Sequence, residues 1–181
     1  MWKLLNQITR TGLCSEKPSA APWACNTLPQ EHSPEAAQHA LLKIVGRALT
    51  IRAIDAGSCN GCELEMHALS NPYYNLEGAG LRFVASPRHA DLLLVTGPVA
   101  RNMLQPLLRT IEATPRPRFV VALGECACTG GWFGDSYATL GALSRVLPVD
   151  LHIPGCPPEP GFILACLLNF LQRLPAERLP A

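Results

Sequence analysis

The chain has 181 residues, of which 48% are hydrophobic and only 16% are charged, and its formal net charge at pH 7 is +1. These values exclude an intrinsically disordered chain, and they argue against nucleic-acid binding, which needs an excess of basic residues on one face. The length gives room for one domain with one adequate core. Low charge with abundant apolar residues favours one component of a larger complex, buried among partners, over the alternative, an ordinary compact monomer.

The beginning of the chain carries no recognisable targeting signal. Residues 1–8 hold one positive charge and an apolar stretch that is too short for a signal peptide. There is no twin-arginine signal, and no uninterrupted apolar run reaches the roughly 18 residues of a membrane span. We therefore expect a cytoplasmic chain, and metal binding explains its abundance of cysteines (eight in all) better than disulfides do.

Residues 1–33 are rich in Pro, Ser and Ala and show little periodicity, which predicts an irregular N-terminal arm. Residues 34–181 are predicted to form a single α/β domain. Ser33 followed by Pro34 predicts the start of a helix that continues to about Val45.

After this helix, apolar strands alternate with helices. The predicted strands are 49–55, 81–85, 91–96, 119–123 and 150–153, and the predicted helices are 63–69, 102–113 and 158–174. Near-continuous apolar strands between helices are typical of a parallel sheet that is covered on both faces. We therefore predict a flavodoxin-like open parallel sheet, in which ligand sites lie beyond the carboxyl ends of the strands.

Cysteines follow three of the predicted strands. Cys59 and Cys62 follow the first strand, Cys126 lies in the segment 124–131 after the fourth, and Cys156 follows the fifth. Four thiolates are the ligand complement of a cubane 4Fe–4S cluster. The sequence therefore predicts such a cluster, and an electron-transfer role, at the carboxyl ends of the strands.

The residues between and after these cysteines suit close backbone approach to a cluster. Asn60 and Gly61 can adopt the left-handed conformation needed to wrap two ligands of one loop around the same cube. The glycines at 130–131 allow a tight turn without side chains after Cys126. The prolines at 157–158 restrict the chain after the last cysteine and remove two amide donors.

Two other interpretations of the first cysteine pair stay open on chemistry alone. Structural zinc would need further ligands, for which His152 is a candidate. A thioredoxin-like redox pair is also compatible with two cysteines at the start of a helix. Neither interpretation accounts for Cys126 and Cys156 in their Gly-rich and Pro-rich segments.

Four segments, in the same order, resemble motifs of the small subunits of nickel–iron hydrogenases. These are Asp55-Ala56-Gly57-Ser58-Cys59-Asn60-Gly61-Cys62-Glu63 and the segments 86–91, 124–131 and 153–158. The chain is most similar to the energy-converting, membrane-associated group, which includes formate hydrogenlyase and carbon-monoxide-linked hydrogenases. The resemblance covers roughly residues 45–172, and the first 45 residues depart from the family pattern.

The same superfamily contains the 20 kDa cluster-bearing subunit that lies next to the quinone site of respiratory complex I. That subunit typically has two adjacent cysteines in its first motif. Two residues separate Cys59 from Cys62 here, which favours the hydrogenase branch.

The resemblance implies that Cys59, Cys62, Cys126 and Cys156 ligate one 4Fe–4S cluster that faces the nickel–iron centre of a partner large subunit. The family spacing of a cysteine, three residues and two glycines selects Cys126 over Cys128 as the third ligand. The chain alone is therefore not expected to be catalytic, but to belong to an oxidoreductase complex that reduces protons or oxidises hydrogen.

No cysteines remain in a pattern for nickel or for further clusters, so the resemblance also implies a ferredoxin-like iron–sulfur partner. Integral membrane subunits of an antiporter-like arm are expected to hold the complex at the cytoplasmic face of the inner membrane. The first alternative is a complex I-like subunit that passes electrons to quinone, and the second is a zinc-stabilised scaffold without enzymatic activity.

Glu63 matches the family's glutamate after the second cysteine and is predicted to contact the large subunit or to relay protons. The alternative is stabilisation of a helix N-terminus, which is worth some tenths to about 1 kcal/mol. Arg88 and His89 are candidates for the interface or for tuning the cluster potential, and otherwise form a solvated turn. Asp55 is expected to accept amide hydrogen bonds at the start of its loop.

The remaining cysteines have simpler interpretations. Cys166 lies in an apolar helical segment and is predicted to be a small core residue. Cys14 and Cys25 have no nearby residues that complete a metal site, and we treat them as incidental.

Overall fold

A computed structural model describes residues 2, 6, 9 and 47–174 of the chain. The predicted arm of residues 1–33, apart from the three described positions, and the helix predicted from Ser33 to Val45 lie outside the described residues. The boundary between arm and domain therefore stays a prediction.

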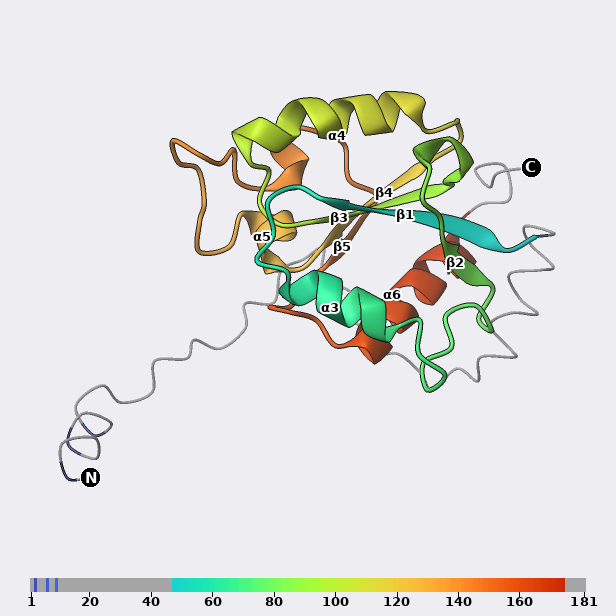
Figure 1. Cartoon of the computed structure of the whole chain (residues 1–181), viewed down its shortest axis with the longest axis horizontal. Coiled ribbons are helices and arrows are strands. Elements are labelled where there is room, and N and C mark those ends of the chain that lie inside the picture. Colours follow the sequence, from blue (N-terminus) through green and yellow to red (C-terminus); the bar gives the residue numbers. More distant parts are fainter. Residues whose placement is uncertain (1, 3–5, 7–8, 10–46, 175–181) are drawn as a thin grey trace.

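Five parallel strands form one sheet in the order β2-β1-β3-β4-β5 (Figure 1). The strands are β1 (Leu49–Asp55), β2 (Leu81–Phe83), β3 (Leu92–Thr96), β4 (Phe119–Leu123) and β5 (Leu151–Ile153). This order is the flavodoxin-like one, so the predicted fold class is confirmed.

Helices cover both faces of the sheet. Helices α3 (Gly61–Ala68) and α6 (Pro160–Arg173) lie on one face, and α4 (Arg101–Ala113) lies on the other together with the short α5 (Glu125–Thr129) (Figure 1). Two 3-10 turns, η1 (Pro87–His89) and η2 (Leu143–Arg145), complete the described elements. None of the described helices has both the length and the apolar content needed to cross a bilayer.

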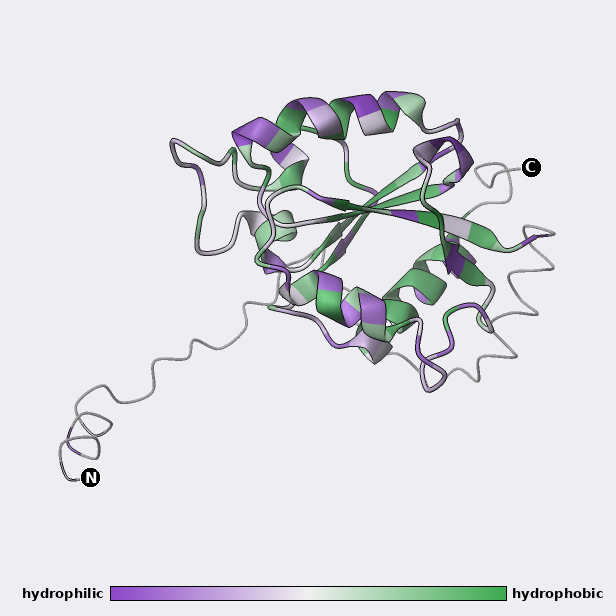
Figure 2. Cartoon of the chain, viewed as in Figure 1, coloured by the Kyte–Doolittle hydropathy of each residue, from purple (hydrophilic) through white to green (hydrophobic). Residues whose placement is uncertain are grey.

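The central strands explain the apolar runs of the sequence, because every residue of β3 and β4 is buried. Alternate side chains point to opposite faces of a strand. Leu92 and Leu94 accordingly join the core under α3 and α6, whereas Leu93 and Val95 join the core under α4 and α5. Figure 2 shows this largely hydrophobic sheet between α4 and α3, which mix hydrophilic and hydrophobic residues, and α6, which is mostly hydrophobic.

The predicted strands and helices agree with the observed ones to within about two residues, with one omission. Helix α5 is absent from the predicted elements, which leave residues 125–129 in a loop. Gly124 precedes it with φ of 87°, and Gly130 ends it in the left-handed conformation with φ of 96°. Five residues form fewer than two helical turns, which is too short for apolar periodicity to be recognised.

Candidate metal centre

The carboxyl ends of four strands stand level with one another. Asp55 pairs with Thr96, Thr96 with Leu123, and Leu123 with Ile153 in the parallel registers of the sheet. Each of the three cysteine-bearing loops leaves the sheet from this row, three or four residues before its first cysteine. The predicted location of the site at the carboxyl edge therefore follows from the register itself.

The loop of Cys59 and Cys62 is held at its start by Asp55. The Oδ1 atom of Asp55 accepts hydrogen bonds from the backbone amides of Gly57 (2.8 Å) and Ser58 (2.7 Å), as expected from the sequence. Asn60 adopts the left-handed conformation with φ of 73°, but Gly61 is already the first residue of α3. The left-handed turn therefore uses one residue rather than the predicted two.

The loop of Cys156 is attached to the start of α5 by backbone hydrogen bonds. The amide of Gly124 donates to the carbonyl of Ile153, and the amide of Glu125 donates to the carbonyl of Gly155, both at 2.8 Å. The peptide bond between Cys156 and Pro157 is cis. These contacts hold the segments of the third and fourth predicted ligands side by side.

The four predicted ligands lie in segments that leave the same edge of the sheet, and two of them have raised thiol pKa values. Burial raises the pKa of the Cys62 thiol to about 12, with further increases from Glu63 and from Cys126, Cys59 and Cys156. Burial also raises the pKa of Cys126, helped by Cys156 and Cys59. Cys59 and Cys156 are exposed, whereas Cys62 is buried, so the group opens to the surface on one side.

Glycines keep side chains away from two of these thiols. A Cβ atom at Gly124 would lie 2.5 Å from the Sγ atom of Cys62, and one at Gly131 would lie 2.9 Å from the Sγ atom of Cys126. The glycines at 130–131 predict a tight turn without side chains, and the positive φ of both residues agrees with such a turn. Side-chain atoms at Gly124 or Gly131 would therefore crowd the thiols.

The donor set suits an iron–sulfur cluster, since soft thiolates are the ligands that such clusters take. Within residues 47–174, no three histidine, cysteine or carboxylate side chains are arranged to hold a single metal ion. In a cubane cluster each cysteine binds a different iron atom, so the thiols surround a group of atoms rather than meet at one point.

Cys128 lies apart from this group although it is only two residues from Cys126. Its side chain is 4% exposed and packs in the core between α5 and the sheet. Its Sγ atom donates to the carbonyl of Ala122 at 3.6 Å, and burial raises its pKa to about 12. Because residues two apart on a helix point about 200° away from each other, α5 directs one cysteine outward and the other inward.

Glu63 connects the first cysteine loop to the end of β3. Its Oε2 atom accepts a hydrogen bond from Ser58 Oγ (2.7 Å), and its Oε1 atom accepts one from the hydroxyl of Thr96. Thr96 is fully buried and also donates to the carbonyl of Ile54. Thr96 could not be predicted from the sequence, because nothing in a buried apolar strand indicates a partner 33 residues away.

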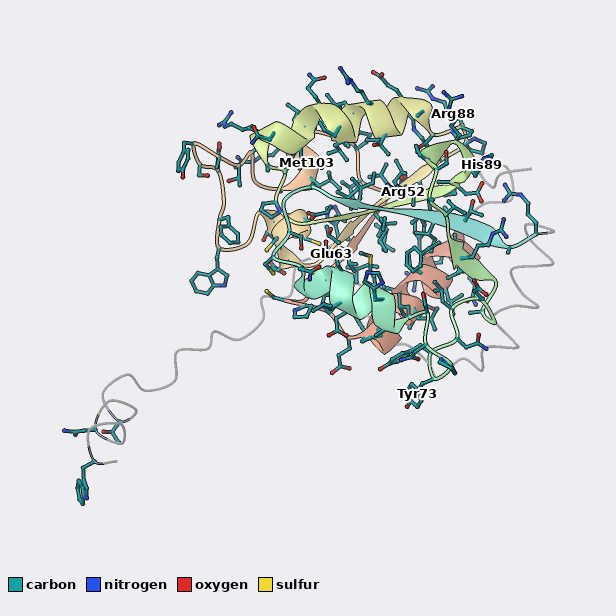
Figure 3. All side chains as sticks on the ribbon, in the orientation of Figure 1. Arg52, Glu63, Tyr73, Arg88, His89 and Met103 are labelled. Carbon is teal, nitrogen blue, oxygen red and sulfur yellow. The ribbon has the colours of Figure 1, made fainter. Side chains whose placement is uncertain are left out.

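Arg88 and His89 lie far from the cysteine loops. They belong to η1, which precedes β3, and so lie at the amino ends of the strands, whereas the cysteines lie at the carboxyl ends. Figure 3 shows both residues at the end of the sheet opposite to Glu63. The idea that they tune a cluster is therefore wrong, and the exposed turn before a strand is what the structure contains.

His152 and Cys166 lie within β5 and α6 and not in the cysteine loops. His152 is on β5 as expected, and burial lowers its pKa. Cys166 lies on the buried face of α6, which confirms its interpretation as a small core residue. Cys14 and Cys25 lie outside the described residues.

Comparison with known proteins gives the family. Residues 59–170 match the model of the family described as "NADH ubiquinone oxidoreductase, 20 Kd subunit". The chain is 43% identical over 134 residues to the probable membrane-bound hydrogenase subunit mbhJ of Pyrococcus furiosus, covering 74% of this chain and 80% of that protein. It is 42% identical over 134 residues to formate hydrogenlyase subunit 7 of Escherichia coli, but spans only about half (51%) of that protein's length.

A third relative comes from the respiratory branch. An NADH-quinone oxidoreductase subunit of Citrifermentans bemidjiense is 42% identical over 118 residues, covering 65% of this chain and 68% of that protein. All three relatives are subunits of hydrogenase, hydrogenlyase or NADH-quinone oxidoreductase complexes.

Solved structures agree with this fold. A chain of the archaeal membrane-bound sulfane sulfur reductase matches with a TM-score of 0.61 and 31% identity, covering 75% of this chain and 76% of that one. A chain of an NAD+-reducing [NiFe]-hydrogenase matches with a TM-score of 0.54 at 20% identity, covering 74% of this chain and 99% of that one. The second similarity concerns the fold alone.

Proposed function

We propose that this chain, which belongs to the family of the NADH ubiquinone oxidoreductase 20 Kd subunit, is an electron-transfer subunit. The complex in this proposal is a membrane-associated nickel–iron hydrogenase. The observation that carries the proposal is the group of four thiols at the carboxyl edge of the sheet. Cys59, Cys62, Cys126 and Cys156 would hold one 4Fe–4S cluster, which supplies one-electron transfer when bound.

The chain's own residues would orient and shield that site. Cys62 would bind the cluster on the core side, because its side chain, in the first turn of α3, is buried between this helix and the sheet. Cys59 and Cys156 hold its exposed side, where electrons enter or leave toward a neighbouring subunit. Glu63 holds the first ligand loop in place through Ser58 and Thr96.

Exposed apolar side chains that follow the cysteines in the sequence support docking of a partner at this edge. Leu64 follows the buried Cys62 by two residues, and Trp132, Phe133 and Tyr137 follow the segment of Cys126; all four are exposed. Aromatic residues exposed on a monomer are enriched at subunit interfaces. The partner in this proposal is the hydrogenase large subunit, whose nickel–iron centre combines two protons and two electrons into hydrogen, or the reverse.

The remaining partners are a ferredoxin-like iron–sulfur subunit, which would exchange electrons with the large subunit through this chain, and integral membrane subunits. Through the latter the complex would lie on the cytoplasmic face of the inner membrane. Glu63 keeps a second proposed role, as a contact or proton relay toward the large subunit. Each of its carboxylate oxygens accepts one hydroxyl hydrogen bond and has room for a second, so Ser58 and Thr96 can stay in place in that role.

A complex I-like subunit that passes electrons to quinone is the second candidate, and the similarity to the NADH-quinone oxidoreductase subunit of Citrifermentans bemidjiense supports it. Two observations favour the hydrogenase: the two residues between Cys59 and Cys62, and the longer alignment with mbhJ. The large subunit purified with this chain would distinguish them, since a nickel-binding partner needs two pairs of cysteines and a quinone-reducing partner needs none.

The test is low-temperature electron paramagnetic resonance with metal analysis on the anaerobically purified, dithionite-reduced complex. The parent and the Cys128→Ser variant should give the signal of a reduced 4Fe–4S cluster, and the Cys126→Ser variant should lose it. Zinc without such a signal in the parent would leave the scaffold as the function of the chain. A signal that survives in Cys126→Ser and is lost in Cys128→Ser would contradict the ligand set.

A further inference from the structure

A recess of about 510 Å³ at the amino end of the sheet collects arginine side chains. It lies between the beginnings of β1 and β2, η1 and the segment that follows α4. Its ionisable lining residues are Arg47, Arg82, Arg88, Arg116, His89 and Asp91. This end of the sheet is opposite to the cysteine loops, so the recess is separate from the proposed metal centre.

The arginines stand out against a neutral background. Residues 47–174 contain ten arginines, no lysine and ten acidic residues, so their formal charges cancel. Four of those ten arginines line this one recess, together with a single carboxylate, that of Asp91. The recess therefore concentrates positive charge that the described chain as a whole does not have.

The carboxylate of Asp91 is paired with Arg47 and Thr50, and it forms no ion pair with the other three arginines. Its two carboxylate oxygens accept a pair of 2.8 Å hydrogen bonds from the guanidinium of Arg47. The Oδ2 atom also accepts from the amide (2.9 Å) and the hydroxyl (2.7 Å) of Thr50. This arrangement neutralises Arg47 and fixes it to the start of β1.

The other three arginines are unneutralised in the described part of the chain. Arg82, Arg88 and Arg116 are exposed, and none of them takes part in an ion pair among the described residues. They come from three separate elements: β2, η1 and the segment after α4. Their guanidinium groups can therefore approach a ligand in the recess from different directions.

We propose that this recess binds a phosphate group. A guanidinium donates two parallel hydrogen bonds to the oxygens of a phosphate or a carboxylate. A carboxylate has two oxygens and so forms one such pair of hydrogen bonds with one guanidinium, as Asp91 does with Arg47. A phosphate has more oxygens and more charge, so it can engage three arginines on three elements. The phosphate is supplied either free in solution or by the headgroup of an anionic phospholipid.

The first arm of the test measures inorganic phosphate binding to the full chain by isothermal titration, in a buffer without other oxyanions. The double variant Arg82→Gln/Arg116→Gln should bind phosphate at least about tenfold more weakly, since each lost fork removes a charge-assisted pair of hydrogen bonds. Arg173→Gln is the matched control, because Arg173 is an exposed arginine on α6 that does not line the recess. Its affinity should equal that of the parent.

The second arm distinguishes the two sources of phosphate. Flotation with phosphatidylcholine vesicles, with and without phosphatidylglycerol, should show binding that needs the anionic lipid and is lost in the double variant if the source is a headgroup. Phosphate binding without flotation assigns the recess to free phosphate. The proposal would be overturned if the parent showed neither phosphate binding nor flotation with anionic vesicles. It would also be overturned if the double variant and Arg173→Gln lost binding equally. Loss of a partner subunit from the double variant, without phosphate binding in the parent, would overturn it in favour of a protein contact.

Discussion

Gly124 lies directly against the thiol of Cys62, so closely that a Cβ atom on Gly124 would be 2.5 Å from the Sγ atom. The contact joins the end of β4 to the first turn of α3, two segments that are far apart in the sequence. Gly124 also has φ of 87° and ψ of 157°, a conformation that is accessible essentially only to glycine. The close contact with the Cys62 thiol and the backbone conformation thus both require glycine at position 124.

We expect the substitution Gly124→Ala to displace the Cys62 thiol and to abolish most of the iron content of the purified complex. The backbone conformation alone should lower the free energy of unfolding by about 1–3 kcal/mol. Gly134→Ala is the matched control: Gly134 also has positive φ, 51°, but a Cβ atom there meets nothing within 4 Å. Metal analysis and thermal denaturation of both variants would check this, and a normal iron content in Gly124→Ala would contradict it.

A second prediction concerns the buried hydroxyl of Thr96. Valine has the same shape but cannot donate to Glu63, so Thr96→Val should leave one carboxylate oxygen without its partner. We expect the free energy of unfolding to fall by about 1–3 kcal/mol. Thr110→Val removes a hydroxyl that donates to the carbonyl of Pro106 along the helix α4, and it should change stability by less than about 0.5 kcal/mol. Chemical denaturation would measure both, and equal effects would refute a bracing role for Thr96.

The sheet could be predicted from the sequence because its strands are buried. Every residue of β3 and β4 is covered on one face or the other, so each strand is a continuous apolar run that ends where the chain leaves the core. The positions of Cys59, Cys126 and Cys156 after strands then locate the site, since parallel strands bring their carboxyl ends to one edge.

Other features depend on contacts that no local pattern reveals. Helix α5 is too short to be recognised by its period, so helical geometry could not predict that Cys126 points outward and Cys128 inward. The hydrogen bond from Thr96 to Glu63 and the recess lined by arginines of separate elements arise only when the sheet assembles. The distance of Arg88 from the cysteine loops likewise becomes evident only in the assembled sheet.

A third prediction follows from the ion pair of Asp91 and Arg47. Burial alone would raise the pKa of Asp91, but the hydrogen bonds from Arg47 and Thr50 outweigh it and lower the pKa below 3.8. The folded state thus favours the carboxylate, and the resulting stability is present above the unfolded pKa and is lost as the pH falls through the folded pKa. We expect Asp91→Asn to lower the free energy of unfolding by about 2 kcal/mol at neutral pH.

The difference between the parent and Asp91→Asn should be constant above about pH 5 and should shrink at more acidic pH. Denaturation at several pH values would measure it. Asp135→Asn is the control, because Asp135 and its partner Arg145 are both 58% exposed, and their ion pair should contribute less than about 1 kcal/mol. A difference for Asp91→Asn that does not change with pH would show that its carboxylate charge contributes nothing.

A fourth prediction separates the cysteines by their reactivity in the metal-free chain. The thiolate is the reactive form, so buried thiols with a pKa of about 12 should react slowly with iodoacetamide. We expect Cys59 and Cys156, which are exposed, to be labelled first, and Cys62 and Cys128 to be labelled much later. Mass spectrometry of peptides over time would give the order. Labelling of Cys128 as fast as Cys59 would contradict the inward orientation on α5.

A fifth prediction tests the exposed aromatic residues as a docking surface. Trp132→Ser should weaken assembly with the large subunit while leaving the melting temperature of the isolated chain unchanged, because the side chain is 94% exposed. Tyr73→Ser changes a comparably exposed aromatic residue, and Figure 3 places Tyr73 beyond α3, away from the cysteine loops. Co-purification of tagged variants would compare them. Equal yields of complex from both would exclude this surface as the interface.

The segment that carries Cys156, the fourth predicted ligand, begins at an edge strand of the sheet. Cys156 follows β5, which has three residues and pairs with β4 alone, whereas β1, before Cys59, is flanked by strands on both sides. Short edge strands open more often than central ones. Under the proposed function, local opening of β5 would release Cys156 from the cluster while the rest of the domain stays folded. We therefore expect the resistance of the cluster to chelators and oxidants to depend on this short strand more than on the stability of the core.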